Sequence, residues 1–223
     1  MTRIVAVTGA AGALGRKTVE VLGRAGWQVV GIDLAEVPAE GLALALGGTD
    51  LADEAAMEGV AVRIEAEFGR LDGLVNIAGG FAWEKVADGN VATWDRLYAT
   101  NIRTALAATR ALLPLLRASA GAIVNIGAAA SAKAGIGMGA YAASKAGVAR
   151  LTEALAEEHK HEGVRVNAVL PSIIDTPANR ADMPDAAFDR WVTPEELANV
   201  ILFLLSSAAS AVTGALIPVT GRV

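Results

Sequence analysis

Cysteine is absent from this sequence, which excludes disulfide bonds, thiolate catalysis and cysteine-ligated zinc. Histidine is almost absent. His159 and His161 lie two residues apart in a charged segment, so on a helix they point to different faces, and we expect no metal site. Long apolar runs are also missing, because the stretch 197–205 is far shorter than the roughly 18 residues that a membrane span needs. We therefore expect no membrane partner.

Basic charge is scarce as well. The formal net charge is -5, whereas nucleic-acid-binding domains are usually basic, so we expect no nucleic-acid partner and a small-molecule substrate instead. The apolar stretch 4–14 is interrupted by glycines and followed directly by Arg16 and Lys17. Because this pattern is unlike a secretory signal, the expected location is the cytoplasm.

Hydrophobic residues make up 53% of the 223 residues, enough for a sizeable core. Short runs of consecutive apolar residues alternate with longer amphipathic segments, a pattern typical of parallel strands covered by helices on both faces. We predict a single α/β domain over residues 1–223, a doubly wound Rossmann fold with a seven-stranded parallel sheet. The expected strands are 3–8, 28–33, 42–46, 72–77, 122–126, 164–170 and 215–219, and the expected helices are 13–25, 52–68, 93–117, 140–162 and 194–206.

A glycine-rich loop follows the first expected strand. Gly9, Gly12 and Gly15 are spaced G-x-x-G-x-x-G, and the next helix begins at once. Glycines let a pyrophosphate approach the backbone, and the helix N-terminus offers free N–H groups and a partial positive charge. The loop, including Ala13 and Leu14, is therefore a candidate dinucleotide site, with an ordinary tight turn as the alternative.

Asp33 ends the second expected strand, 18 residues after Gly15. A carboxylate at this position can accept hydrogen bonds from the adenosine ribose and repels a 2′-phosphate. The sequence therefore predicts NAD as the cofactor, with NADH preferred over NADPH. The alternative is an ordinary aspartate at the end of a strand.

Tyr141 and Lys145 are four residues apart on an expected helix and share one face. A free tyrosine titrates near pH 10, and a nearby ammonium, helped by an oxidised nicotinamide, favours the phenolate. We expect Lys145 to lower the pKa of Tyr141, which could then act as a general acid or base near neutral pH.

Together these features resemble the short-chain dehydrogenase/reductase family, from one end of the chain to the other. The resemblance implies that Tyr141 is the acid/base, that Lys145 binds the nicotinamide ribose and that Asn101 takes part in a proton relay. It also implies further cofactor contacts at positions that match the family's motifs, namely Asp50, Leu51, Asn76, Ala78, Gly79, Pro171, Ile174 and Thr176.

One position departs from the family's pattern. The family carries a serine thirteen residues before the tyrosine, where it polarises the substrate carbonyl, and this chain has Ala128 there. Losing one such donor typically costs roughly 10²–10³ in rate. Ser131 and Ser172 are candidate replacements, although neither aligns with the missing serine.

The departure is shared with a narrower branch that the chain also resembles, the dihydropteridine reductases. The segment Ala78–Phe81, the serine-free loop 128–135 and the run L-P-S-I-I-D-T-P-A-N-R at 170–180 carry this resemblance. It implies reduction of a quinonoid dihydropterin with NADH, and Phe81 and Trp191 are the candidates for stacking on the flat ring.

Two alternatives stay open at this point. One is a reductase or dehydrogenase of ordinary carbonyls or alcohols, such as 3-oxoacyl thioesters. The other is a non-catalytic NAD-binding sensor, which the intact Tyr141, Lys145 and Asn101 argue against. The family pairs the helices expected at 93–117 and 140–162 across a two-fold axis, so we also expect a homodimer or a homotetramer.

Overall fold

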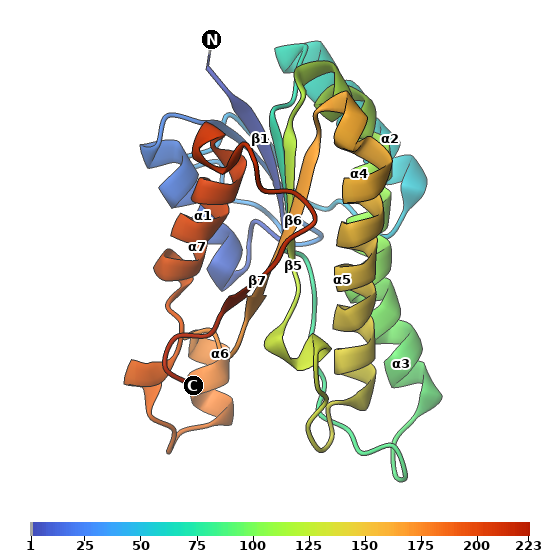
Figure 1. Cartoon of the computed structure of the whole chain (residues 1–223), viewed down its shortest axis with the longest axis vertical. Coiled ribbons are helices and arrows are strands. Elements are labelled where there is room, and N and C mark those ends of the chain that lie inside the picture. Colours follow the sequence, from blue (N-terminus) through green and yellow to red (C-terminus); the bar gives the residue numbers. More distant parts are fainter. Residues whose placement is uncertain (1) are drawn as a thin grey trace.

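The apolar runs of the sequence form one sheet of seven strands, all parallel, in the order β3-β2-β1-β4-β5-β6-β7 (Figure 1). The computed structural model describes residues 2–223. The sheet confirms the predicted doubly wound fold. Its strands are β1 (Ile4–Thr8), β2 (Gln28–Ile32), β3 (Leu44–Leu46), β4 (Gly73–Asn76), β5 (Ala122–Ile126), β6 (Arg165–Pro171) and β7 (Leu216–Val219).

Helices cover both faces of the sheet (Figure 1). On one face lie α1 (Ala13–Arg24) and α7 (Pro194–Leu205), and on the other lie α2 (Glu54–Phe68), α4 (Thr104–Ser119) and α5 (Gly139–His159). Within residues 2–223, no helix is both long enough and apolar enough to cross a membrane. The shorter elements are α3 (Val91–Tyr98), α6 (Pro177–Asp182), the π-helical turn η1 (Ala99–Arg103) and the 3₁₀ turns η2 (Ala129–Ser131), η3 (Lys160–Glu162), η4 (Phe188–Arg190) and η5 (Ser207–Ala209).

The central strand β1 shows why the sheet has two cores. Val5 and Val7 pack toward α1 and α7, whereas Ile4 and Ala6 pack toward α2 and α4. All five residues of β1 are buried, as expected for a strand covered on both faces. Chain order reverses between β1 and β4, and ligands of open α/β sheets bind at such a switch point, beyond the carboxyl ends of the strands.

The structure differs from the predicted elements in two places that matter for the site. The single helix expected at 93–117 begins at Val91, capped by Asn90, and is interrupted by η1 before it continues as α4. The short helix α6 was not predicted at all. It begins at a capping threonine followed by a proline, a start signal that the sequence carried at Thr176 and Pro177.

At the amino ends of the strands, away from the switch point, the Arg165 side chain joins β6 to α7. Arg165, at the start of β6, donates to the carbonyls of Leu204 and Ala209 at 2.7 and 3.1 Å and also to those of Leu205 and Ser206. These carbonyls belong to the end of α7 and the turn after it, where the backbone lacks helical partners. One guanidinium therefore completes the hydrogen bonding of a whole helix end.

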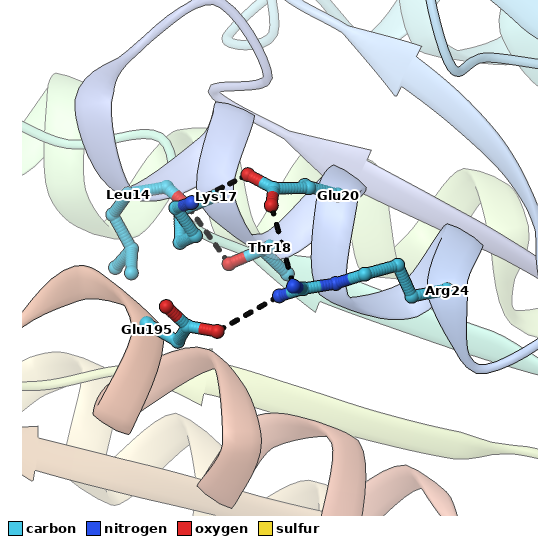
Figure 2. A network of polar contacts seen from close by, with 6 residues as sticks. All are labelled: Leu14, Lys17, Thr18, Glu20, Arg24 and Glu195. Atoms are coloured by element: carbon cyan, nitrogen blue, oxygen red, sulfur yellow. Dashed lines mark hydrogen bonds and ion pairs between the residues drawn. The ribbon is translucent and has the colours of Figure 1, made fainter.

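An ion-pair chain joins the two helices on the α1 face. Figure 2 shows Lys17, Glu20 and Arg24 along α1, with Arg24 reaching Glu195 in the first turn of α7 at 2.8 Å. Arg24 lies in the last turn of its helix and Glu195 in the first turn of its own, so both charges also complement the helix dipoles. All four side chains are substantially exposed, so we assign this chain a small part in stability.

Candidate active site

The loop between β1 and α1 and the first turn of α1 approach their neighbours so closely that a glycine is required at two positions. Gly9 has a positive φ of 68°, and a Cβ there would lie 2.8 Å from the main-chain nitrogen of Ala78. A Cβ at Gly15 would lie 2.0 Å from the Gly9 carbonyl oxygen. Gly12 is the N-cap of α1 and has no side chain to satisfy the free N–H groups of the first turn. The loop thus leaves these donors available to a ligand.

A cleft of about 800 Å³ opens above this loop, at the carboxyl ends of β1, β2 and β4. It brings together most of the residues proposed from the sequence as cofactor contacts. These are Gly9, Gly12, Ala13, Leu14, Gly15, Asp33, Asp50, Leu51, Ala78, Gly79 and Thr176. The other lining residues were not predicted from the sequence. They are Leu34, Ala52, Ile77, Ala99, Thr100, Thr104, Pro177 and Ala178.

Asp33 lies on the wall of the cleft, and both of its carboxylate oxygens already accept a main-chain hydrogen bond. One accepts from the Ala11 nitrogen at 2.9 Å and the other from the Ala35 nitrogen at 3.0 Å. The carboxylate is therefore fixed in place and ties the glycine-rich loop to the end of β2. Each oxygen keeps a second lone pair that a ribose hydroxyl could use.

Asn76, predicted as a cofactor contact, is not among the residues that line the cleft, and this contact stays a prediction. Its side chain is buried and donates to Thr109 at 3.1 Å and to Asn125 at 2.8 Å, in a polar network between the sheet and the α4 and α5 layer. Asn125 in turn donates to Thr152 on α5. The Asn76 Nδ2 therefore helps to join β4, β5 and two helices beneath the cleft, whereas its buried Oδ1 has no hydrogen-bond partner among the described residues.

Pro171 and Ile174 also lie apart from the residues that line the cleft. Pro171 is buried at the end of β6, and Ile174 forms an isolated parallel bridge with Val192. Their contribution in this structure is to set the direction in which the chain leaves β6. The residues that reach the cleft from this segment are those that follow, Thr176 to Ala178.

Lys145 is buried beneath the cleft, and its Nζ donates to the carbonyl of Ile126 at 2.8 Å. Burial lowers the pKa of this ammonium to about 8 because a charge is costly away from water. Tyr141 lies one turn earlier on α5, and burial raises its pKa to about 12. The expected lowering of the Tyr141 pKa by Lys145 is thus not found in the chain alone, where burial is the dominant effect.

Asn101 connects the loop after β4 to α5. Its Oδ1 accepts from the Gly80 nitrogen at 2.8 Å, and its Nδ2 donates to the Gly80 carbonyl at 3.1 Å and to Ser144 Oγ at 2.9 Å. Ser144 then donates to the Tyr141 carbonyl. The π-helical turn carries Asn101 at its centre, and such turns are common at functional sites. Ser144 was not among the predicted site residues, although it immediately precedes Lys145.

The candidates for the substrate side are only partly brought together. Ala128 is buried two residues after β5, and Ser131 lies in the turn that follows it, with its nitrogen donating to the Ala128 carbonyl. Phe81 is 53% exposed and packs edge-on against the Tyr141 ring, with centroids 4.9 Å apart. These three therefore lie around the end of α5 that carries Tyr141.

Two other candidates are placed elsewhere. The Ser172 hydroxyl donates to the Thr220 carbonyl at 2.8 Å, so it is engaged with the chain after β7. Trp191 is buried and packs edge-on against Phe188, which leaves its ring without an exposed face for a ligand. The stacking of Trp191 on a substrate ring stays a prediction, and in this structure the indole is buried.

A parallel sheet, a glycine-rich loop after its first strand and a Tyr–Lys pair on the helix after β5 define a dinucleotide-dependent oxidoreductase of the Rossmann type. The chain belongs to the short-chain dehydrogenase/reductase family: residues 3–187 match the family described as short chain dehydrogenase. It is therefore a nicotinamide-dependent enzyme that acts on small molecules, rather than the non-catalytic sensor considered above.

Relatives of known activity match almost the whole chain. It is 34% identical to 2-(S)-hydroxypropyl-CoM dehydrogenase 3 of Xanthobacter autotrophicus, over 98% of this chain and 95% of that protein. It is 38% identical to cis-4-hydroxycyclohexanecarboxylate dehydrogenase of Sinomonas cyclohexanicum, with the same coverage. Among solved structures, the ligand-free aldohexose dehydrogenase of Thermoplasma acidophilum superposes with a TM-score of 0.90 at 26% identity, covering 99% of this chain and 93% of that one.

The close approach of Asn101 and Lys145 predicts a strict requirement for glycine at position 79. A Cβ there would lie 2.7 Å from Asn101 Oδ1 and 3.4 Å from Lys145 Nζ. We expect Gly79→Ala to lower kcat/KM by about tenfold or more, because a misplaced catalytic group can cost that much. The matched control is Gly80→Ala, whose Cβ would meet only Thr100 at an ordinary 3.5 Å. Equal activity of the two variants would contradict this reading of the site.

Burial of Lys145 predicts how stability changes with pH. Its pKa is about 8 in the folded chain and 10.5 as the ordinary value, so between these limits the unfolded chain binds more protons and stability rises with pH. We expect wild type to gain up to about 3 kcal/mol relative to Lys145→Met from pH 7 to 10.5.

Thermal unfolding of wild type, Lys145→Met and the exposed-site control Lys85→Met, followed across this pH range, provides the measurement. The raised pKa of Tyr141 opposes the trend above pH 10, because the folded chain then retains a proton that the unfolded chain releases. Since all three proteins keep Tyr141, the comparison isolates the lysine. Parallel curves for wild type and Lys145→Met would show that the ammonium is not buried in solution.

Proposed function

We propose that this enzyme is an NADH-dependent reductase whose acceptor is a conjugated ring, of the quinonoid dihydropterin type. The observation that carries the proposal is Ala128. Where the family places a hydroxyl that polarises a carbonyl, this chain has a buried methyl group. An acceptor that spreads the incoming charge over several atoms needs that hydroxyl least.

The cleft fits a nicotinamide dinucleotide. The glycine-rich loop comes closer to neighbouring backbone than a Cβ would allow, and the amino end of α1 beside it has free N–H groups for a pyrophosphate. Asp33 and Asp50 lie on the wall where an adenosine would be held. When bound, the cofactor supplies the hydride.

Tyr141 is the proposed proton donor for the reduced ring. With its pKa raised to about 12, the phenol holds its proton at neutral pH, which is the state that a reductase needs at the start of the reaction. Lys145, protonated at neutral pH, is proposed to bind the nicotinamide ribose and to stabilise the phenolate that remains after proton transfer. Asn101 holds the loop after β4 against α5 and so positions both groups.

A second candidate is the oxidation of a secondary alcohol, or the reverse reduction of a ketone. The names of the relatives favour it, because they describe dehydrogenases of hydroxy compounds, and galactitol 2-dehydrogenase of Rhizobium johnstonii, 38% identical, is another. In that case Ser131, one turn after Ala128, is the nearest hydroxyl in sequence that could replace the missing serine.

The pairing of α4 and α5 across a two-fold axis stays a prediction.

The geometry of Asp33 predicts the cofactor preference. We expect wild type to have the higher kcat/KM with NADH, since a 2′-phosphate would meet this carboxylate. Asp33→Ala should lower kcat/KM for NADH by roughly 10–100-fold, through the loss of charge-assisted hydrogen bonds, and narrow the gap to NADPH. Asp33→Asn is the control, because it removes the charge and keeps an oxygen for one of the two main-chain donors. Equal or better use of NADPH by wild type would refute the assignment.

Position 128 predicts the substrate class. On a ketone, where negative charge builds up on one oxygen, Ala128→Ser should raise kcat/KM by about tenfold or more. On a quinonoid dihydropterin the same change should have little effect or reduce activity, because the charge is delocalised and the hydroxyl intrudes on the ring.

The test compares wild type, Ala128→Ser and Tyr141→Phe on a quinonoid dihydropterin and on a 3-oxoacyl thioester. Tyr141→Phe should depress turnover of the thioester strongly, because the alkoxide formed from its keto group needs a proton. The loss should be smaller for the pterin, because water can protonate the reduced ring. Wild-type turnover of the thioester well above that of the pterin would overturn the pterin proposal. It would leave the nicotinamide-dependent reductase in place.

A further inference from the structure

The segment between β6 and α7 forms one wall of the cleft through Thr176, Pro177 and Ala178. Its two ends meet at a fixed point. The Asp175 nitrogen donates to the Val192 carbonyl at 2.8 Å, and the Val192 nitrogen donates to the Ile173 carbonyl at 3.0 Å. Residues 176–191 are therefore a closed loop whose base is anchored to the sheet and whose outer part contains α6.

Inside this loop, Arg180 holds α6 down. Its Nε donates to one oxygen of Asp175 at 2.5 Å and its Nη2 to the other at 2.7 Å, a two-pronged pair. The other side of the guanidinium faces the ring of Phe188, with its central carbon 4.7 Å from the ring centroid. Phe188 then packs edge-on against the buried Trp191. We call Asp175, Arg180 and Phe188 the Arg180 clasp.

The clasp links the two halves of the loop, because Asp175 precedes α6 and Phe188 follows it. The helix has six residues and is too short to be stable by itself, so its position depends on such contacts. The Arg180 side chain is 51% exposed, and ion pairs at exposed sites are weak. The clasp can therefore hold the loop and still open during each catalytic cycle, as loops that cover active sites commonly do.

We propose that Arg180 is a positioning residue that sets how fast the cofactor enters and leaves, by holding Thr176, Pro177 and Ala178 against the cleft. The proposal rests on the cofactor placement proposed above. It does not depend on which substrate the enzyme reduces.

The experiment measures NADH release from the full chain by stopped-flow fluorescence, together with steady-state KM and kcat. Arg180→Gln should release NADH roughly fivefold faster than wild type, since it loses both the ion pair and the ring contact. Arg180→Lys should fall between the two, because a lysine keeps the charge but not the planar, two-pronged geometry. Phe188→Leu should also accelerate release, because it removes the ring beneath the guanidinium.

The control is Arg190→Gln, an exposed arginine of the same loop for which the structure of residues 2–223 shows main-chain hydrogen bonds only. A general loss of stability would lower the melting temperature and affect kcat. The clasp predicts instead a higher KM for NADH with an unchanged pH profile of kcat, because Tyr141 is untouched. The double variant Arg180→Gln with Asp175→Asn should be no faster than Arg180→Gln alone.

Release rates for Arg180→Gln within twofold of wild type, or the same acceleration in Arg190→Gln, would overturn the proposal. Binding of neither NADH nor NADPH by wild type would overturn the cofactor placement and this inference with it. Binding of NADH with turnover of a ketone but not of a pterin would refute the proposed substrate alone and leave the clasp supported by its release rates.

Discussion

The arrangement of the site depends on one buried ammonium group. Lys145 donates to the carbonyl at the end of β5, and this bond ties α5 to the sheet beside the site. Tyr141 and Ser144 lie on the same helix, so their positions follow from it, and Ser144 in turn binds Asn101. Burying the ammonium of Lys145 costs free energy, as its lowered pKa indicates, so this group destabilises the folded chain at neutral pH. Its proposed role in the site explains why the lysine is buried there.

Features carried by short stretches of sequence could be predicted, and features made by distant residues could not. The seven strands could be predicted because each is a continuous apolar run, and the turn from Gly9 to Gly15 could be predicted because its regularly spaced glycines follow the first strand directly. The direction of the Asn76 side chain could not be foreseen, because it depends on Thr109 and Asn125 from other elements. The same holds for the interior position of Trp191, whose ring packs against Phe188.

The π-helical turn at Asn101 illustrates this limit. A helical periodicity was present throughout 93–117, and it gave no sign that one turn would widen. The widened turn holds an asparagine whose donors and acceptor are all engaged by Gly80 and Ser144. Since these partners come from the loop after β4 and from α5, local propensity could not reveal the distortion. The helix was predicted correctly as an element and wrongly as a regular one.

The four carbonyl contacts of Arg165 lie at the amino ends of the strands, and the cleft lies at their carboxyl ends. Asp72, just before β4 at the same end of the sheet, accepts hydrogen bonds from the Ile4 nitrogen and from the Arg70 side chain. Hydrogen bonds that stabilise the fold and residues of the candidate active site thus lie at opposite ends of the same strands. A protein built in this way can acquire new substrates by changes in its loops, because the residues that hold the helices and strands together at the other end need not change.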